Sequence, residues 1–164
     1  MTLVGPAWGE DTNYPSIGLR GGVSTSQAED PFWQTEFFST WDLPWKITSS
    51  TNWILKPRLE LAAGLIQGNG TEGFIGSLGP ELVFGHKQFP VILVGGLSLT
   101  GLSRDKFKER DLGFPLEFTS HLGLEWTFLE HWKLGYRFQH MSNAGLGHSN
   151  PGLNMSMISL QYQF

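Results

Sequence analysis

The 164-residue chain contains no cysteine, which excludes disulfide scaffolds, thiolate zinc sites and cysteine nucleophiles. Charged residues are scarce, at 16% of the chain, compared with roughly 25% in an ordinary soluble domain. The net charge of −4 leaves no basic surface for nucleic acid, so no nucleic-acid partner is expected. No stretch approaches the ~20 apolar residues of a membrane helix, and the first residues lack the basic and apolar regions of a signal peptide.

The chain is instead rich in aromatic residues, at 13%, and in glycine, with 21 residues. Its length fits one domain of about 150 residues with a sizeable core. A low charge content combined with many aromatic residues is not typical of a cytosolic enzyme. Hydrophobic periodicity therefore becomes the informative signal.

Residues 112–128 alternate between apolar and small or polar side chains, with Ser120 as the one polar residue in the apolar phase. This period of two continues over 17 residues, longer than a usual strand of a water-soluble sheet. The pattern resumes after a short turn, with Trp132, Leu134, Tyr136 and Phe138 on one face. The same alternation predicts eight strands, at about 15–25, 31–43, 53–66, 73–85, 89–103, 111–129, 131–143 and 154–164. No helical period is present, so we predict an all-β fold, a single eight-stranded antiparallel transmembrane β-barrel over residues 1–164.

The polar face of these strands is suited to the interior of such a barrel. It carries mostly Gly, Ser, Thr and Gln, which fit a narrow lumen, and a few charges of both signs, which can pair there. The charged members are Arg20, Glu36, Lys56, Arg58, Glu60, Glu81, Glu117, Glu125, Lys133 and Arg137. The bulky apolar face then contacts lipid, whereas a soluble lipocalin-like barrel would present a charge-rich outer face.

The connections favour a bacterial outer-membrane barrel. Longer loops (about 24–31, 67–72, 104–110 and 144–153) alternate with shorter turns (44–52, 86–88 and 130), and both termini are expected on the short, periplasmic side. Five tryptophans lie near the short turns, as an interfacial girdle would: Trp41, Trp45, Trp53, Trp126 and Trp132. The chain also ends on Phe164, as outer-membrane barrels typically do.

A small barrel has a filled lumen, so chemistry is expected on its loops or outer wall. The lipid-facing stripe of residues 131–143 continues in phase to His140 and Ser142. These residues share one strand face and can form the nucleophile–base pair that activates a hydroxyl group. Eight residues separate Trp132 from His140, about 26 Å along the strand, which places His140 near the outer-leaflet boundary. Polar residues at the outer rim can equally be interfacial decoration.

The other histidines offer no ligand spacing. His121 is expected to face the lumen, His86 and His131 lie in short turns, and His148 lies in the last loop without a second ligand. No metal site and no cofactor are predicted.

The stretch from Arg137 to Asn154 resembles the C-terminal signature of PagL-type lipid A 3-O-deacylases. It reads RFQHMSNAGLGHSNPGLN and contains the His-x-Ser-Asn-Ala-Gly-Leu run that precedes an Asn-containing loop and the last strand in that family. The resemblance implies an outer-membrane esterase that hydrolyses the 3-position acyl chain of lipid A. It further implies that Ser142 is the nucleophile and His140 the general base.

Asn154 departs from the family pattern, because the third catalytic member there is commonly a glutamate. Asn154 is in phase with Ile158 and Leu160 and so faces lipid; a hairpin centred near His148 would place it across from Ser142. A neutral amide can fix the imidazole tautomer but cannot stabilise imidazolium by charge.

The residues around the pair supply further candidates. Asn143 and the amides of Ala144 and Gly145 follow the proposed nucleophile and are candidates for an oxyanion hole, or they simply lead into a loop. Phe118, on the neighbouring strand, is expected opposite residues 140–142, where it could line an acyl groove or contact the bilayer.

The sequence therefore predicts a serine esterase acting on lipid A of lipopolysaccharide in the outer leaflet, within membrane lipid. A non-catalytic outer-membrane barrel that anchors or binds through its loops, and an outer-leaflet phospholipase with the same pair, remain alternatives. The sequence specifies neither the acyl-chain preference nor the oligomeric state.

Overall fold

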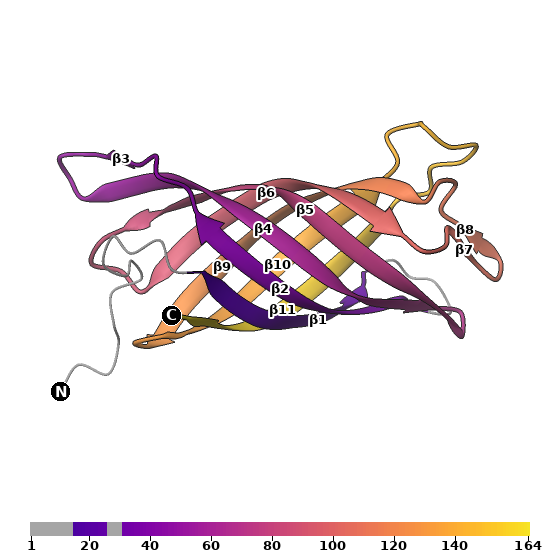
Figure 1. The fold of residues 1–164 in the computed structure, drawn as a ribbon, viewed down its shortest axis with the longest axis horizontal. Helices are drawn as coiled ribbons and strands as arrows, with labels where there is room; N and C mark the ends of the chain where they lie inside the picture. Colours follow the sequence, from indigo (N-terminus) through magenta and orange to yellow (C-terminus); the bar gives the residue numbers. More distant parts are fainter. Residues whose placement is uncertain (1–14, 26–30) are drawn as a thin grey trace.

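The computed structural model, which describes residues 15–25 and 31–164, is a closed antiparallel β-barrel (Figure 1). Its eight long strands are β1 (Ser16–Ser24), β2 (Trp33–Asp42), β4 (Trp53–Gly68), β5 (Thr71–His86), β6 (Val91–Leu102), β9 (Leu116–Leu129), β10 (Trp132–Ser142) and β11 (Leu153–Gln163). Each pairs with its neighbours in sequence, and pairing of β1 with β11 closes the barrel. The predicted eight-stranded fold is confirmed. Within the described ranges, no helix is long and apolar enough to cross a membrane.

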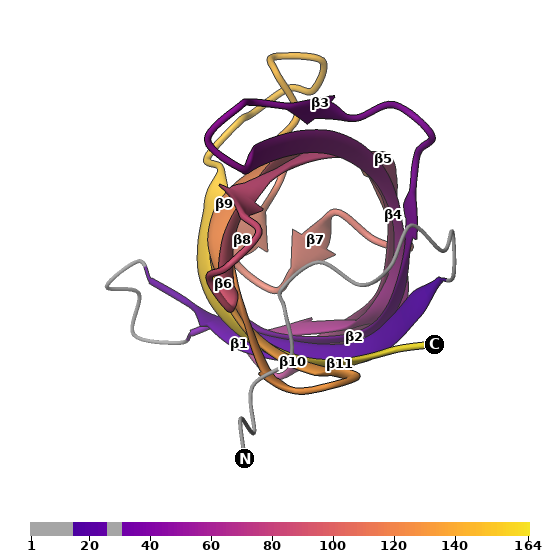
Figure 2. The ribbon, with the colours of Figure 1, turned by 90° about the vertical axis from the view of Figure 1, so that its left-hand side faces the viewer.

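Three two-residue strands complete the structure: β3 (Ile47–Thr48), β7 (Lys106–Phe107) and β8 (Arg110–Asp111). β3 pairs with the start of β4, where β2 no longer runs beside it. β7 and β8 form a small hairpin at the opposite end from the C-terminus (Figure 1). Viewed along the barrel, this hairpin projects within the outline of the wall (Figure 2). The predicted absence of a leader peptide concerns residues 1–14, and the predicted loop at 24–31 is centred on residues 26–30; both segments lie outside the described residues.

The alternation of the sequence decides which side chains face outward. Large apolar side chains cover the outer wall, with Phe37 74% and Phe74 70% exposed. Their neighbours along the same strands point inward, and Glu36 is only 1% exposed. An apolar outer wall with charged residues inside is the arrangement of a barrel that has lipid as its solvent, as predicted.

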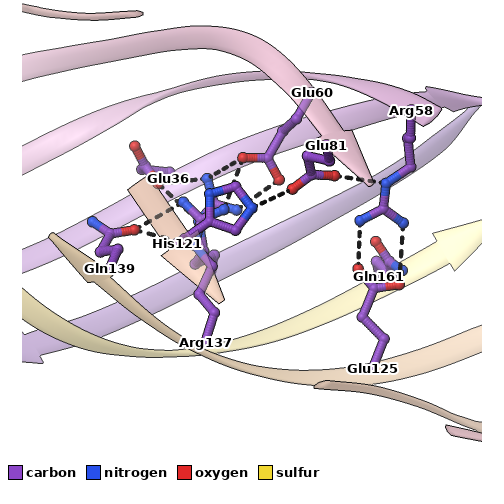
Figure 3. A network of polar contacts seen from close by, with 10 residues as sticks. Glu36, Arg58, Glu60, Glu81, His121, Glu125, Arg137, Gln139 and Gln161 are labelled. Carbon is purple, nitrogen blue, oxygen red and sulfur yellow. Dashed lines mark hydrogen bonds and ion pairs between the residues drawn. The ribbon is translucent and has the colours of Figure 1, made fainter. Parts of the chain in front are cut away.

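The inward charges form two clusters (Figure 3). Arg20 pairs with Glu36 and Glu60, and Arg137 also reaches Glu60 at 2.9 Å. In the second cluster, Arg58 pairs with Glu81 and Glu125. His121 Nε2 lies 2.8 Å from Glu81 and so joins the network, as expected for a lumen histidine. These ion pairs fill the middle of the lumen.

Towards the end that carries β7 and β8, the lumen is apolar. Ten buried side chains pack there: Phe32, Ile66, Ile75, Leu102, Phe107, Leu112, Met141, Leu153, Met155 and Met157. We call this set the apolar plug. Phe32 and Phe107 meet edge to face, with ring centroids 5.2 Å apart. Because Phe107 and Leu112 come from the segment between β6 and β9, the plug ties this loop to the wall.

Two details of the predicted connections are wrong. The segment 67–72 is no long loop, since β4 and β5 continue to a two-residue turn at Asn69 and Gly70, with φ angles of 50° and 67°. Asn-Gly favours this tight hairpin because both residues tolerate positive φ. The strand predicted at 111–129 begins only at Leu116, because Gly113, with φ of 91°, and Pro115 interrupt it. Leu112 therefore lies in the apolar plug and not on the lipid-facing stripe.

Candidate functional site

Strand β10 ends with two polar residues on the outer wall. Its outward side chains run from Trp132 to Phe138 and are all apolar or aromatic, but the next two are His140, which is exposed, and Ser142, which is half-buried. Both lie at the end of β10 that pairs with the start of β9, directly after the β7–β8 hairpin in the chain. The site predicted from the alternation is therefore open to the membrane side of the wall and not to the lumen.

Asn154 lies directly opposite His140 on β11. Its Oδ1 atom is 2.7 Å from Nδ1 of His140. The hairpin centre is at residue 147, one residue before the predicted one, and this moves the partner of Asn154 by two positions, from Ser142 to His140. With this register the Asn154 side chain reaches the His140 ring directly. In the predicted register the two side chains would be farther apart.

The contact with Asn154 sets the protonation pattern of the ring. With an amide oxygen as acceptor, Nδ1 of His140 carries the proton, and Nε2 keeps its lone pair. A Cβ atom built on Gly152 would lie 3.0 Å from Cε1 and 3.7 Å from Nε2 of this ring. Gly152 directly precedes β11, one position beyond the Met141–Leu153 pair and so at the level of Ser142. The basic edge of the imidazole is thus turned towards the level of Ser142.

Ser142 and His140 approach without bonding. In the described part of the chain, no hydrogen bond joins the two side chains. Residues i and i+2 of a strand are about 6.6 Å apart, a separation that the imidazole and the serine hydroxyl bridge by rotation about their side-chain bonds. Catalytic hydrogen bonds are often long in the absence of substrate and tighten when it binds.

Asn143 holds the loop that follows Ser142. The side chain is fully buried, and its Nδ2 donates to the carbonyl oxygens of Leu112 and Ser149 at 2.9 and 2.7 Å. Its Oδ1 accepts from the Gly145 amide at 2.9 Å, and its own backbone N–H donates to Asn150. The Asn143 side chain therefore stabilises the loop that follows β10 through hydrogen bonds to its backbone.

Ala144 and Gly145 form the centre of a tight turn. The Leu146 amide donates to the Asn143 carbonyl at 3.0 Å, and the two central residues have φ of 53° and 82°. This left-handed conformation is rare for alanine, and such outliers cluster at functional sites. In the described segments, the amides of Asn143 and Gly145 have acceptors, whereas the Ala144 N–H has none. Of the three candidate donors, it is the one left free.

Strand β9 contributes two residues beside the pair. Phe118 is opposite Ser142 and Ser120 is opposite His140. Ser120 is exposed on the outer wall, where the next outward residues are leucines. Ser120 is not among the predicted site residues, although its hydroxyl group interrupts the apolar stripe of residues 112–128. It flanks the imidazole on the side away from Asn154.

A second polar pair lies one step further from the loops. The hydroxyl groups of Tyr136 and Ser156 are 3.2 Å apart on the outer wall. Ser156 follows Asn154 on the same face of β11, and the sequence makes it the alternative to Asn154 for holding the His140 ring. Because its hydroxyl is bonded to Tyr136, Ser156 is not a hydrogen-bond partner of the His140 ring in this structure.

The remaining histidine of the loops contacts a carboxylate. His148 Nε2 lies 3.0 Å from Asp111 Oδ2, and Lys106 Nζ lies 3.2 Å from the same oxygen. Over residues 15–25 and 31–164, no three His, Asp or Glu side chains are arranged as ligands of a metal ion. The site contains the groups of an acid–base and nucleophilic reaction.

The chain is similar to known proteins both in sequence and in fold. Residues 32–163 match the protein-family model described as lipid A 3-O-deacylase (PagL). The lipid A deacylase PagL of Bordetella bronchiseptica is 33% identical over 69 residues, which are 42% of this chain and 39% of that protein. The chain thus matches well under half of the length of this relative.

Solved structures show the same fold. The crystal structure of the outer membrane enzyme PagL superposes with a TM-score of 0.79 at 18% identity, over 91% of this chain and 99% of that one. The crystal structure of Neisserial surface protein A gives a TM-score of 0.59 at 10% identity, over 93% and 98% of the two chains. At these identities, the likeness concerns the barrel alone.

Proposed function

Because the chain belongs to the PagL family of lipid A 3-O-deacylases, we propose that it hydrolyses the ester-linked acyl chain at the 3-position of lipid A. The enzyme resides in the bacterial outer membrane, with the β7–β8 end facing outward. Ser142 is the nucleophile, His140 the general base and Asn154 the residue that orients the ring. The substrate is lipopolysaccharide of the outer leaflet.

The observation that carries this proposal is the hydrogen bond between His140 Nδ1 and Asn154 Oδ1, 2.7 Å long, on a wall that faces lipid. Polar side chains at a lipid-facing position are unfavourable and are found mainly where they have a function. A histidine whose tautomer is fixed by a partner, with a serine two residues away, is the arrangement that activates a hydroxyl group.

The reaction begins with proton transfer from the Ser142 hydroxyl to Nε2 of His140, as Oγ attacks the ester carbonyl carbon. The resulting oxyanion accepts a hydrogen bond from the free Ala144 N–H. The intermediate collapses with cleavage of the bond to the sugar oxygen, which takes the proton from the imidazolium. The products of this half-reaction are the acyl-serine and the free sugar hydroxyl.

Water completes the cycle. His140 Nε2 removes a proton from a water molecule that attacks the acyl-serine carbonyl carbon. Collapse of the second intermediate breaks the bond to Oγ, returns the proton to Ser142 and releases the fatty acid. Throughout, Asn154 Oδ1 accepts a hydrogen bond from Nδ1–H of His140 and so keeps Nε2 directed at the reacting oxygen.

The position of the site matches the position of the ester. His140 and Ser142 occupy the last outward positions of β10, next to loops at one end and apolar wall at the other. An ester between a polar sugar and an acyl chain lies at the same boundary of a leaflet. The acyl chain then contacts the apolar wall while the sugar remains among the loops.

Mass spectrometry of lipid A after incubation with the purified, refolded protein tests this proposal. We expect loss of the mass of one ester-linked acyl chain and release of the matching fatty acid, with no such loss for Ser142→Ala. Unchanged lipid A would contradict the proposal. Release of fatty acid from phospholipid vesicles but not from lipid A would instead identify an outer-leaflet phospholipase.

A further inference from the structure

The imidazole of His140 has a backbone neighbour as well as a side-chain partner. Gly152 has φ of 62°, a conformation that glycine adopts without strain. Any side chain there would press on the ring, because its Cβ would lie 3.0 Å from His140 Cε1. The Gly152 backbone thus bounds the same edge of the ring that holds the basic nitrogen.

An arginine from another loop holds this backbone. Nη2 of Arg110, in β8, donates a hydrogen bond of 2.7 Å to the carbonyl oxygen of Gly152. Its guanidinium carbon also lies 6.0 Å from the centre of the Phe32 ring. Arg110 therefore reaches Gly152 from the side of the apolar plug, whereas the His140 ring lies beside Gly152 on the outer wall.

The bonding of Arg110 indicates that this contact is its main interaction. Across the described ranges, Arg110 has no carboxylate partner, and its Nε atom is buried without a hydrogen-bond partner. A half-buried guanidinium without an ion pair is unfavourable. Its charge-assisted bond to a carbonyl oxygen is stronger than a bond between neutral groups, so it restrains the Gly152 peptide firmly.

The restraint extends to Asn154. Leu153, between the two, is 1% exposed and packs in the apolar plug. Along this segment, the Gly152 carbonyl group is hydrogen-bonded, the Leu153 side chain is buried and the Asn154 side chain points outward. Movement of Gly152 would change both the edge contact and the Nδ1 hydrogen bond of the imidazole.

We propose that Arg110 and Gly152 are positioning residues for His140, holding the imidazole at its Nε2 edge from inside the barrel mouth. The inference rests on the proposed function, in which His140 is the general base. Neither residue takes part in proton transfer or bond formation, so their loss affects the orientation of the base and not substrate binding.

Kinetics of Arg110 variants provide the first test. We expect Arg110→Met, which keeps the aliphatic stem, to lower kcat by about 10- to 100-fold with little change in KM. Arg110→Lys, which retains one charged donor, should recover much of the loss. Arg104→Met, at an exposed arginine of the same loop, is the matched control and should behave as wild type. Wild-type kcat in Arg110→Met would overturn the proposal, as would equal losses in Arg110→Lys.

A glycine pair separates ring contact from backbone strain. Gly152→Ala and Gly70→Ala both place alanine at a φ near 65° (62° and 67°), but the Cβ at Gly70 would meet only the flexible end of Lys108. We expect Gly152→Ala to lower kcat and Gly70→Ala to leave it unchanged. Equal kcat in the two variants would contradict a role for the Gly152 edge.

A readout without turnover distinguishes failure of this inference from failure of the proposed function. Ring ¹⁵N NMR of His140, assigned by comparison with His140→Gln, reports the tautomer and the Nδ1 hydrogen bond. We expect the Nδ1-protonated form in wild type and its partial loss in Arg110→Met. Unchanged ring signals in Arg110→Met would overturn the positioning role whether or not lipid A is a substrate. Full activity of Ser142→Ala would overturn only the proposed mechanism.

Discussion

Nδ1 of His140 and Oδ1 of Asn154 are 2.7 Å apart across the pairing of β10 with β11. The two residues are directly opposite each other, so the contact follows from the register of the last hairpin and needs no loop to adjust. A neutral amide fixes the ring tautomer here, without supplying charge to the imidazolium.

Loss of either reacting group should abolish activity but not folding. Ser142→Ala and His140→Ala remove side chains that lie on the outer wall and contribute nothing to the apolar plug. We expect a heat-modifiable folded barrel in both variants and a loss of deacylation of roughly a thousandfold or more. Gel mobility before and after boiling and mass spectrometry of lipid A measure the two properties. Wild-type activity in either variant would place the nucleophile or base elsewhere.

Asn154 offers a graded test. Asn154→Ala removes the acceptor of the Nδ1 proton and should lower kcat by about 10- to 100-fold, less than loss of Ser142. Asn154→Glu restores a carboxylate that stabilises imidazolium by charge, so activity should equal or exceed that of wild type. Steady-state kinetics on lipid A in detergent micelles measure both. Full turnover by Asn154→Ala would reduce the site to a Ser–His dyad.

Glu60 should be a stability determinant without a catalytic role. It accepts hydrogen bonds from Arg20 at 2.9 and 3.1 Å and from Arg137 at 2.9 Å, and all three side chains lie inside the barrel. Glu60→Gln leaves two buried guanidinium groups poorly compensated, and we expect a loss of about 3–5 kcal/mol in the free energy of unfolding. Urea unfolding in lipid vesicles, followed by tryptophan fluorescence, measures the loss. Glu72→Gln, at an exposed position of the β4–β5 hairpin, is the control.

The contact between Asp111 and His148 should make the last loop sensitive to acid. The pKa of Asp111 is lowered from its ordinary value, first because His148 bonds to its carboxylate and further through the Gly113 amide and Lys106, against a smaller opposing effect of desolvation. A lowered pKa in the folded state contributes stability above the pKa of the unfolded state, and this is lost as the pH falls through the folded value. Protection of residues 143–152 against hydrogen exchange, taken relative to the intrinsic exchange rate at each pH, should therefore fall in the acid range below that of an ordinary aspartate, about pH 3.9. Asp111→Asn should show fast exchange already at neutral pH; a slow, pH-independent loop in that variant would contradict the role.

Spin labels should report the two faces of the last strands. Labels at Leu134, Phe138 and Leu160, all exposed on the outer wall, should be relaxed by oxygen dissolved in the bilayer. A label at Gln161, 2% exposed, should be shielded from it. Continuous-wave EPR with oxygen as the relaxing agent measures the contrast, and accessibility of Gln161 equal to that of Leu160 would contradict the orientation.

Much of the fold could be predicted because lipid imposes a simple rule on every strand. The period-two pattern assigned the inward charges and the outward stripe, and the family resemblance is confirmed by the family match. The pattern could not reveal that a strand can be shorter than the stretch of sequence that alternates. Leu112 continues the apolar phase of residues 116–128, yet Gly113 and Pro115 turn the chain, and the side chain lies in the apolar plug.

The site was predictable only in part, for a related reason. His140 and Ser142 are close in sequence and share a strand face, so their proximity follows from strand geometry alone. Which residue of β10 lies opposite Asn154 depends on the centre of the last hairpin. That centre is set by the left-handed turn at residues 144–145 and by the positive φ of Gly152, which the alternation does not show. Arg110 is 42 residues from Gly152 along the chain, and no local pattern could connect them.

The opening of the site through the wall, and not through the lumen, has a kinetic consequence. A substrate that reaches the site from the bilayer arrives by lateral diffusion within one leaflet. Its effective concentration is therefore its surface density in that leaflet. Dilution of the membrane with inert lipid, at a constant bulk concentration of substrate, should therefore slow the encounters between enzyme and substrate. Addition of more vesicles of the same composition should not accelerate an enzyme that is already embedded in one vesicle. Under the proposed function, we expect the released acyl chain to remain in the leaflet that supplied it and to compete there with the next substrate molecule for the same strip of wall.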